Sequence, residues 1–237
     1  MDGPSHAAGC GRAHERVAGD SAEPHALPLY TTGEEIANAV THGLGAMLSV
    51  AGLTLLVVKA ALAGGTWVSM LSAVVFGGSL VLEYSMSALY HAIQYPPAKR
   101  VFRILDHSCI YLLIAGSYTP FTLGPLIDRG GLALFCAVWA FALAGIGLEV
   151  FMRERQPRWL TVAIYLVMGW LVLFNLPALV ASVPFQALAL TAAGGACYTV
   201  GCAFYLMKRV RYMHSVWHLW VLAGSVCQFL AVIAFII

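Results

Sequence analysis

The chain has 237 residues, of which 60% are hydrophobic and only 10% are charged. A soluble domain carries about 25% charged residues, so this composition excludes an ordinary soluble enzyme and indicates a chain solvated mostly by lipid. The formal net charge of +2 favours neither a nucleic acid nor an acidic protein as partner.

The first 33 residues are polar and rich in Gly, Pro, Ser and His. They lack the basic region, apolar stretch and small-residue cleavage site of a signal peptide. We therefore interpret residues 1–33 as a disordered tail, followed by one membrane domain over residues 34–237.

Seven apolar runs in residues 34–237 are long enough for a membrane-spanning helix, which needs about 20 residues. Polar or Gly/Pro-containing connectors separate them. The runs cover residues 36–61, 67–90, 104–126, 132–151, 159–181, 185–207 and 213–237. The sequence therefore predicts an all-α membrane protein with a seven-transmembrane-helix bundle. The connector at 182–184 has no charge, so the count of seven depends partly on it.

Basic residues are distributed unevenly over the connectors. The second, fourth and sixth connectors hold Lys99, Arg100, Arg103, Arg153, Arg155, Arg158, Lys208, Arg209 and Arg211. The first, third and fifth hold only Arg129, with Lys59 near the far end of the first run. By the positive-inside rule, this pattern predicts a cytoplasmic amino terminus, an extracytoplasmic carboxyl terminus and a multi-pass protein of the plasma (inner) membrane.

The few polar residues within the runs gather at one predicted depth, within about two turns of the cytoplasmic face. They are Glu35, Asn38 and His42 in the first run, Ser87 and His91 in the second, Asp106 in the third, and His214 and His218 in the seventh. A charge at the membrane centre costs at least ~2.5 kcal/mol, and ionisable groups in spans usually mark function.

Two residues of this layer, His214 and His218, are four positions apart and therefore share one helix face. That is the spacing of helical zinc sites. Taken singly, each residue also has a simpler explanation: a histidine can bond at the interface, Asp106 can favour a helix amino terminus, and Ser87 can bond back to the Glu83 carbonyl. Such separate roles do not explain why three helices supply these groups at one level, which favours a metal site.

In these residues the chain resembles the hemolysin III family, the prokaryotic branch of the progestin and adipoQ receptor (PAQR) proteins. The resemblance covers about residues 34–237, and residues 105–120 are especially like the bacterial members. Its motifs are Glu35-x-x-Asn38-x-x-x-His42, Ser87-x-x-x-His91, Asp106 and His214-x-x-x-His218.

The resemblance implies a seven-helix bundle with its amino terminus inside and a Zn²⁺ ion near the cytoplasmic face. The zinc ligands would be His91, His214 and His218. Asp106 would hold a water on the metal, with the Ser87 hydroxyl nearby. Glu35, Asn38 and His42 would form a second shell or a structural hydrogen-bond network.

Three protein ligands and an open fourth position are typical of catalytic zinc. Because no Glu follows His214, the proton acceptor must come from another helix, and Asp106 is the candidate for general base. We therefore predict a zinc-dependent hydrolase of a lipid amide or ester, with a ceramide-like amide as the first substrate class.

Three further points stay open on the sequence alone. The protein could instead be a cytolytic pore-former or a receptor-like sensor of membrane state with a structural zinc, although a pore needs a polar stripe through the full membrane. Haem ligation is a weaker alternative, because His214 and His218 share one face. Pro120 removes the backbone bond to Gly116 and favours a kink in the third run, either for packing or beside a cavity for an acyl chain.

Overall fold

The computed structural model describes residues 30–152, 157–207 and 209–237, and within these residues every regular element is helical. The tail prediction therefore lies, up to residue 29, outside the described residues, as do Arg153, Arg155 and Lys208 of the basic connectors. The α-helices are α1 (Thr32–Leu62), α2 (Trp67–Ala92), α3 (Pro96–Leu123), α4 (Gly131–Met152), α5 (Arg158–Trp170), α6 (Leu176–Ser182), α7 (Phe185–Leu206) and α8 (Met213–Phe235). Short 3-10 helices lie at Ile127–Arg129 and Leu171–Asn175. The predicted all-α class is confirmed.

Among the described residues, six helical segments are long and apolar enough to cross a membrane, which makes this a multi-pass membrane protein. They are α1, α2, α4, residues 159–182, α7 and α8. The remaining long helix, α3, has 28 residues but carries Lys99, Arg100, Arg103 and Asp106 in its first half. The seventh span and the orientation of the termini stay predictions.

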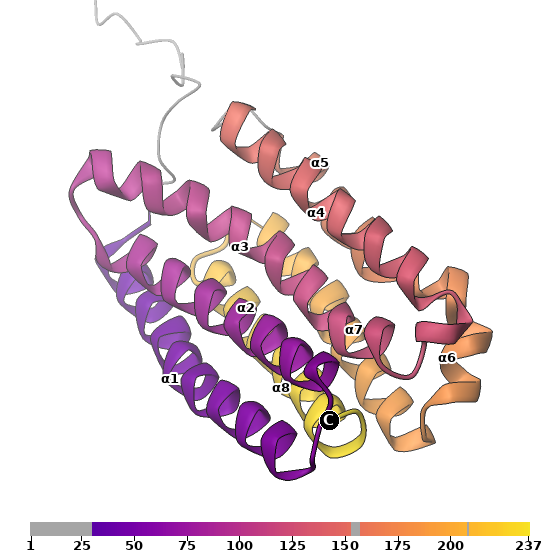
Figure 1. Ribbon diagram of the computed structural model, residues 1–237. Coiled ribbons are helices and arrows are strands. Elements are labelled where there is room, and N and C mark those ends of the chain that lie inside the picture. The colour runs from indigo at the N-terminus through magenta and orange to yellow at the C-terminus, as the bar shows by residue number, and fades with distance from the viewer. Residues whose placement is uncertain (1–29, 153–156, 208) are drawn as a thin grey trace, which may run out of the picture.

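The helices pack as a ring in which each contacts the next (Figure 1). Going round, α1 packs against α2, α2 against α3, α3 against α4, α4 against α5, α5 against α7, α7 against α8, and α8 against α1. Contacts of α3 with both α5 and α8 cross the middle of the ring. The first and last helices are thus neighbours, which brings residues almost two hundred positions apart to one place.

The start of α1 is fixed by a capping box. The Thr31 hydroxyl accepts from the Glu34 N–H at 3.3 Å, and the Glu34 carboxylate accepts from the Thr31 N–H at 2.9 Å. The same carboxylate also accepts from the backbone N–H of Tyr212, at 3.0 Å, immediately before α8. One side chain therefore satisfies orphan donors at the beginning of two helices.

Helix α3 begins at Pro96, eight residues before the apolar run that predicted it. Proline suits the first turn of a helix because the N–H it lacks would have no intrahelical partner there. The extra turns bring Lys99 into the protein, where it is only 7% exposed and donates to the Tyr90 carbonyl at 2.9 Å.

The fifth run, predicted as one segment over 159–181, is divided into α5, a 3-10 turn and α6. Pro177 lies in the first turn of α6 and cannot donate a backbone hydrogen bond. At the break, the Tyr118 hydroxyl accepts from the Val172 N–H at 3.1 Å and donates to the Gly169 carbonyl at 2.7 Å. Helix α3 thus supplies the bonds that the interrupted helix loses.

Candidate metal centre

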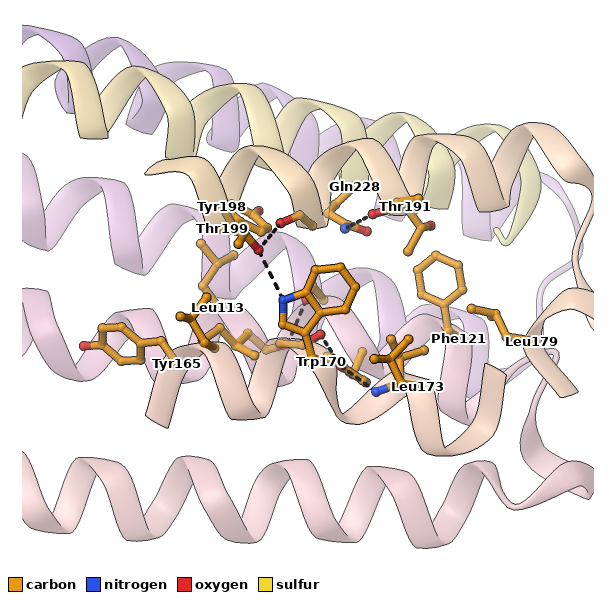
Figure 2. Close-up of a pocket in the computed structure, with 18 of the residues that line it drawn as sticks. Leu113, Phe121, Tyr165, Trp170, Leu173, Leu179, Thr191, Tyr198, Thr199 and Gln228 are labelled. Carbon is orange, nitrogen blue, oxygen red and sulfur yellow. Dashed lines mark hydrogen bonds between the residues drawn. The ribbon is translucent and has the colours of Figure 1, made fainter. Parts of the chain in front are cut away.

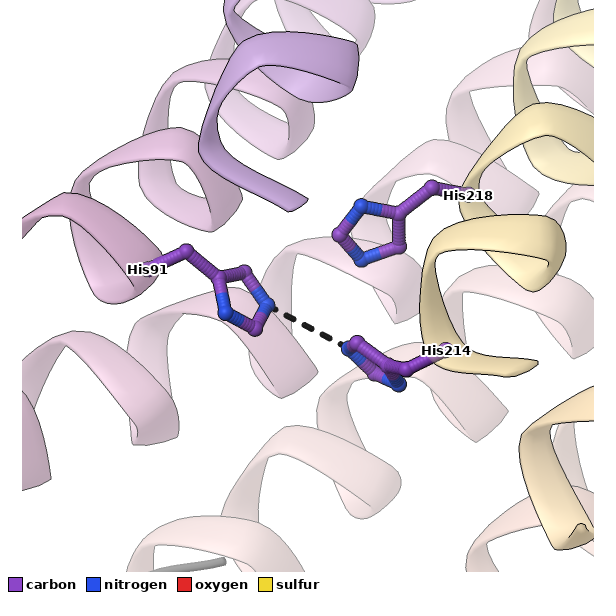
Figure 3. Close-up of side chains that lie close together, drawn as sticks. All are labelled: His91, His214 and His218. Atoms are coloured by element: carbon purple, nitrogen blue, oxygen red, sulfur yellow. Dashed lines mark hydrogen bonds between the residues drawn. The ribbon is translucent and has the colours of Figure 1, made fainter. Parts of the chain in front are cut away.

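Three imidazole rings from α2 and α8 converge on one point (Figure 3). One nitrogen from each of His91, His214 and His218 lies within 4.8 Å of the other two. The Nε2 atoms of His91 and His214 are 3.2 Å apart. Two nitrogen ligands of a tetrahedral zinc, with bonds of 2.0–2.1 Å, would be roughly 3.4 Å apart. The cluster therefore matches the donor type and spacing of a metal site.

The orientation of His91 is set by the amino-terminal turn of α1. Its Nδ1 lies 2.7 Å from Glu35 Oε2, and because a carboxylate only accepts, Nδ1 carries the proton. The Nε2 lone pair is then free to face the cluster. The other oxygen, Glu35 Oε1, lies 2.9 Å from the buried ammonium of Lys99. A Lys–Glu–His series thus leads into the candidate site.

The orientation of His218 is set in the same way by a hydroxyl. Thr41 donates its hydroxyl hydrogen to the Ala37 carbonyl at 2.9 Å, so its Oγ1 accepts from His218 Nδ1, 3.2 Å away. That leaves the Nε2 of His218 without a proton. This atom is fully buried and has no hydrogen-bond partner among the described residues. A buried lone pair of this kind is costly unless something binds it.

The position of α8 relative to α1 is held by two further bonds. Ser215 Oγ donates to Asn38 Oδ1 at 2.5 Å, and the Tyr212 N–H donates to Glu34. His214, on the turn between them, is stacked on Tyr30 with ring centroids 5.1 Å apart. The end of α2 and the start of α8, which carry the candidate ligands, are therefore both hydrogen-bonded to the first two turns of α1.

The predicted second-shell residues are brought to the cluster, with different contacts. Glu35 bonds to His91, and Asn38 bonds to Ser215 beside the histidines. His42 stacks on His218 with ring centroids 3.6 Å apart and an interplanar angle of 16°. The Tyr84 ring lies nearly perpendicular to that of His42, with centroids 4.9 Å apart. Neither ring nitrogen of His42 has a partner among the described residues.

The two predicted catalytic residues lie next to the cluster on α2 and α3. Asp106 is 1% exposed and has His91, Ser87 and Arg103 among its electrostatic neighbours. Ser87 is fully buried, and its hydroxyl does not bond back to the Glu83 carbonyl. The simpler explanation of Ser87, a bond back to the Glu83 carbonyl, is therefore wrong. The neighbouring His107 bonds to Glu149 on α4 at 2.8 Å.

One ionisable residue beside the site was not among the sequence candidates. Glu83 is fully buried, and its charge interacts with that of Asp106. It precedes Ser87 by four residues and His91 by eight, so the three share one face of α2. That spacing, Glu83-x-x-x-Ser87-x-x-x-His91, is the sequence signal that could have found it.

Glu83 also borders an apolar cavity of about 210 Å³ between α3, α5, α7 and α8 (Figure 2). A single water molecule needs only roughly 10–15 Å³, so the cavity has room for part of a larger molecule. Its walls are mainly Leu, Ile and aromatic side chains, among them Leu113, Phe121, Trp170 and Leu179. Glu83 therefore connects the two features: it interacts with Asp106 beside the candidate metal centre and lines the cavity.

Comparison with known proteins gives a consistent result. The family model described as "Haemolysin-III related" matches residues 30–229. The chain belongs to this family. It is 42% identical over 205 residues to the "Hemolysin-3 homolog" of Bacillus subtilis (strain 168), covering 86% of this chain and 95% of that protein. It is 40% identical over 204 residues to "Hemolysin-3" of Bacillus cereus, covering 86% and 92%.

The family also has more distant relatives in animals. The human "Monocyte to macrophage differentiation factor" is 26% identical over 214 residues, covering 85% of this chain and 84% of that protein. These matches confirm the predicted membership of the hemolysin III family and its place in the PAQR superfamily. They run through all the helices that carry the cluster, from α1 to α8.

Proposed function

We propose that this haemolysin-III-related protein is a zinc-dependent hydrolase of a lipid amide or ester, ceramidase-like in the bond that it breaks. The observation that supports the proposal is the tautomer and orientation of two of the histidines. His91 and His218 each commit Nδ1–H to an acceptor, so both present an unprotonated Nε2 to the same point. Imidazoles held in this way by a carboxylate or hydroxyl are typical of metal ligands.

The donor set fits zinc better than the other common ions. Three neutral imidazoles suit Zn²⁺, Cu²⁺ or Ni²⁺ and disfavour Mg²⁺ and Ca²⁺, which prefer oxygen ligands. His91, His214 and His218 would hold the ion. When bound, zinc supplies a Lewis acid that polarises a carbonyl and acidifies a water molecule.

The chain's own groups supply the rest of the chemistry. Asp106 lies beside His91 and would accept the proton of the attacking water as general base. The Ser87 hydroxyl, next to Asp106, would hydrogen-bond the substrate's amide or ester group. Both side chains are at most 1% exposed, so bulk water is excluded from the reacting groups.

The cavity gives a place for the substrate's hydrocarbon chain. It runs along α3 from Ile110 to Thr122 and on to Leu126 in the following turn. This stretch contains Gly116 and Pro120, where the sequence predicted either a packing kink or an acyl site. Leu173 lines the cavity although it is 51% exposed, so the cavity reaches the outer surface of the bundle. A lipid could thus enter sideways from the bilayer.

We also propose that α3 is a seventh span and that the amino terminus is cytoplasmic in the plasma membrane. A helix of 28 residues is about 42 Å long, enough for the hydrocarbon core. Its basic residues lie at one end, as the positive-inside rule expects. Membrane-impermeant thiol labelling of single cysteines at Gly64 and Arg100, in a variant without its native cysteines, tests this: only G64C should react from outside.

The decisive experiment combines metal analysis with turnover. Purified protein should contain about one zinc per chain, and His214→Ala should contain almost none. The zinc-loaded protein should hydrolyse at least one member of a panel of lipid amides and esters, and Asp106→Ala should keep its zinc but lose turnover. Full zinc occupancy without turnover of any panel member would remove the hydrolase and leave the structural-zinc alternative.

The name of the Bacillus cereus relative makes pore formation the rival to test alongside. Conductance in planar bilayers that persists in His91→Ala protein would favour the pore over the enzyme. We expect no such conductance, since the histidines of α1, α2 and α8 lie at one end of these helices. The buried polar residues beyond them are few: Ser49, Ser72, Ser79, Glu83, Ser225 and Gln228.

A further inference from the structure

Glu83 is a carboxyl group that the hydrolase chemistry does not use. Both of its oxygens are buried, and none of the described residues donates a hydrogen bond to either. It lies two turns from His91, or about 12 Å deeper along α2. In a membrane span an ionisable group without a partner is costly, and such groups are kept where they meet a ligand, an ion or another protein group.

The described surroundings of Glu83 offer no such partner. One electrostatic neighbour is a second carboxyl, Asp106, which would repel rather than stabilise it. Three tyrosines, Tyr84, Tyr165 and Tyr198, are also neighbours, but their hydroxyls bond elsewhere. Those of Tyr84 and Tyr198 bond to Ser225, and that of Tyr165 donates to the His107 carbonyl. The side chain of Cys109 is also near both acids but is a weak donor. On its other side Glu83 borders the cavity. The missing donor is therefore most simply supplied by whatever occupies the cavity.

The form of the cavity restricts that occupant. Most of its wall is hydrocarbon and aromatic surface, which fits an alkyl chain. At the membrane-facing rim, the Trp170 indole donates to the Thr199 hydroxyl at 3.2 Å, so these two groups already satisfy each other. Farther in, the Gln228 amide donates to the Thr191 carbonyl at 3.1 Å. Glu83 is thus the polar group on this wall that most needs a partner.

We propose that the cavity binds a single-chain amphiphile whose head carries a hydrogen-bond donor, an amine or a hydroxyl, and that Glu83 accepts from this head. A fatty acid of the same length would bring a third carboxyl group to Glu83 and Asp106 and is disfavoured. The inference deepens the proposed function, on which it rests for the bound lipid being a substrate or product. The binding itself needs no metal.

Photo-crosslinking with three matched probes tests the site. The probes are C18 chains with the same mid-chain diazirine and an amine, an alcohol or a carboxylic acid as head, offered to the full-length protein in nanodiscs. A hydrogen bond to a charged group contributes about 1.5–3 kcal/mol. We therefore expect the amine to label the wild-type cavity at least about tenfold more than the acid, with the alcohol between them.

Two substitutions of Glu83 separate charge from hydrogen bonding. Glu83→Gln keeps an accepting oxygen, so it should lose the preference for the amine and keep that for the alcohol. Glu83→Leu should lose both preferences while still binding the chain. Glu149→Gln is the matched control, because Glu149 is a buried carboxyl that pairs with His107 and does not line the cavity. It should label like the wild type.

Equal labelling of the wild type by amine and acid would overturn the proposal, as would an unchanged amine preference in Glu83→Leu. Crosslinks that map outside the cavity wall would do the same. The probes are also applied to metal-free His214→Ala protein. The same preference there supports the lipid site whether or not the hydrolase exists, whereas its loss would contradict a site independent of metal.

Discussion

The two sides of the helix ring are built differently. In α2 and α8, which carry the histidines, 44% and 39% of the membrane-crossing window is buried inside the protein. In α7 and in residues 159–182, which form one wall of the cavity, the share is 17%. The first pair forms the interior of the molecule, and the second faces mostly outward to lipid.

The polar groups follow the same division. Beside the histidines, bonds between helices fix the ligand-bearing turns, as in Glu35 with His91 and Ser215 with Asn38. Among the described residues, the atoms left without a partner there belong to the proposed site itself and to His42 stacked on it: His218 Nε2, Ser87 Oγ, Asp106 Oδ1 and both ring nitrogens of His42. At the cavity, a buried carboxyl is left unpaired. Satisfied networks hold a fixed geometry, while an unsatisfied group invites a ligand. The comparison separates a rigid site for an ion from a site for an exchangeable molecule.

The largest effect is expected at His218, and the stacked ring of His42 provides the contrast. His218→Ala removes a ligand and should lower zinc content from about one per chain to below a tenth. His42→Phe removes a ring with no bonded nitrogen and keeps the stack, so zinc content should stay within about twofold. Metal analysis of both purified variants measures this. Loss of zinc in His42→Phe would show that His42 is part of the metal site.

A smaller effect is expected from the residues behind the ligands. Glu35→Gln keeps an acceptor for His91 but leaves the buried Lys99 without its counter-charge. Outer partners of metal ligands typically contribute 10–100-fold in affinity, so we expect a loss in that range. Competition with a zinc chelator gives the dissociation constants.

Lys99→Met should show a similar loss through the same pair, because it leaves the Glu35 carboxylate unpaired. Arg100→Met is the matched control: it removes the same charge one residue away, from an exposed side chain. If Arg100→Met weakens zinc as much as Lys99→Met does, the effect is long-range electrostatics and the Lys99–Glu35–His91 series has no special role.

Much of this arrangement could be predicted from the sequence, because it depends on periodicity and on the cost of polar groups in lipid. The spacing of His214 and His218 placed both on one face, and the positions of His91 and Asp106 near the ends of their apolar runs placed them at one depth, although α3 begins ten residues before Asp106. The break at 182–184, uncertain for lack of charge, is where α6 ends and α7 begins. Local rules were sufficient for these features.

Other features could not be predicted, because they depend on contacts between distant helices. Lys99 looked like one of several loop cations, yet a proline-started turn carries it inside to Glu35. Glu34 looked like an ordinary first-turn acid, but it also caps the chain before α8, 178 residues away. Glu83 drew no notice because its significance lies in the absence of a partner, which only three-dimensional packing shows.

The close approach of α1 and α2 near His42 should give a moderate effect on stability. A Cβ at Gly45 would lie 2.6 Å from the Tyr84 ring, the same ring that packs against His42. Overpacking of this kind costs about 1–3 kcal/mol, so Gly45→Leu should lower the thermal midpoint of the detergent-solubilised protein. Gly43→Leu is the control, since nothing lies within 4 Å of its added Cβ. Equal shifts in both variants would argue against tight packing at Gly45.

The smallest effect is expected at the helix caps, where α1 and α2 both begin with a threonine. The hydroxyls of Thr31 and Thr66 each accept a hydrogen bond from a backbone N–H at 3.3 Å. Only at Thr31 does a glutamate, Glu34, complete a capping box by accepting from the threonine's own N–H. Replacing a capping threonine by alanine costs about 1 kcal/mol, or roughly 2–4 °C in the thermal midpoint of a protein of this size. Because Glu34 also bonds to Tyr212, Thr31→Ala should loosen the start of α8 as well. We therefore expect Thr31→Ala to weaken zinc binding slightly and Thr66→Ala to leave it unchanged. If chelator competition shows the same zinc affinity for both variants, the Thr31–Glu34 cap stabilises the fold without affecting the metal centre.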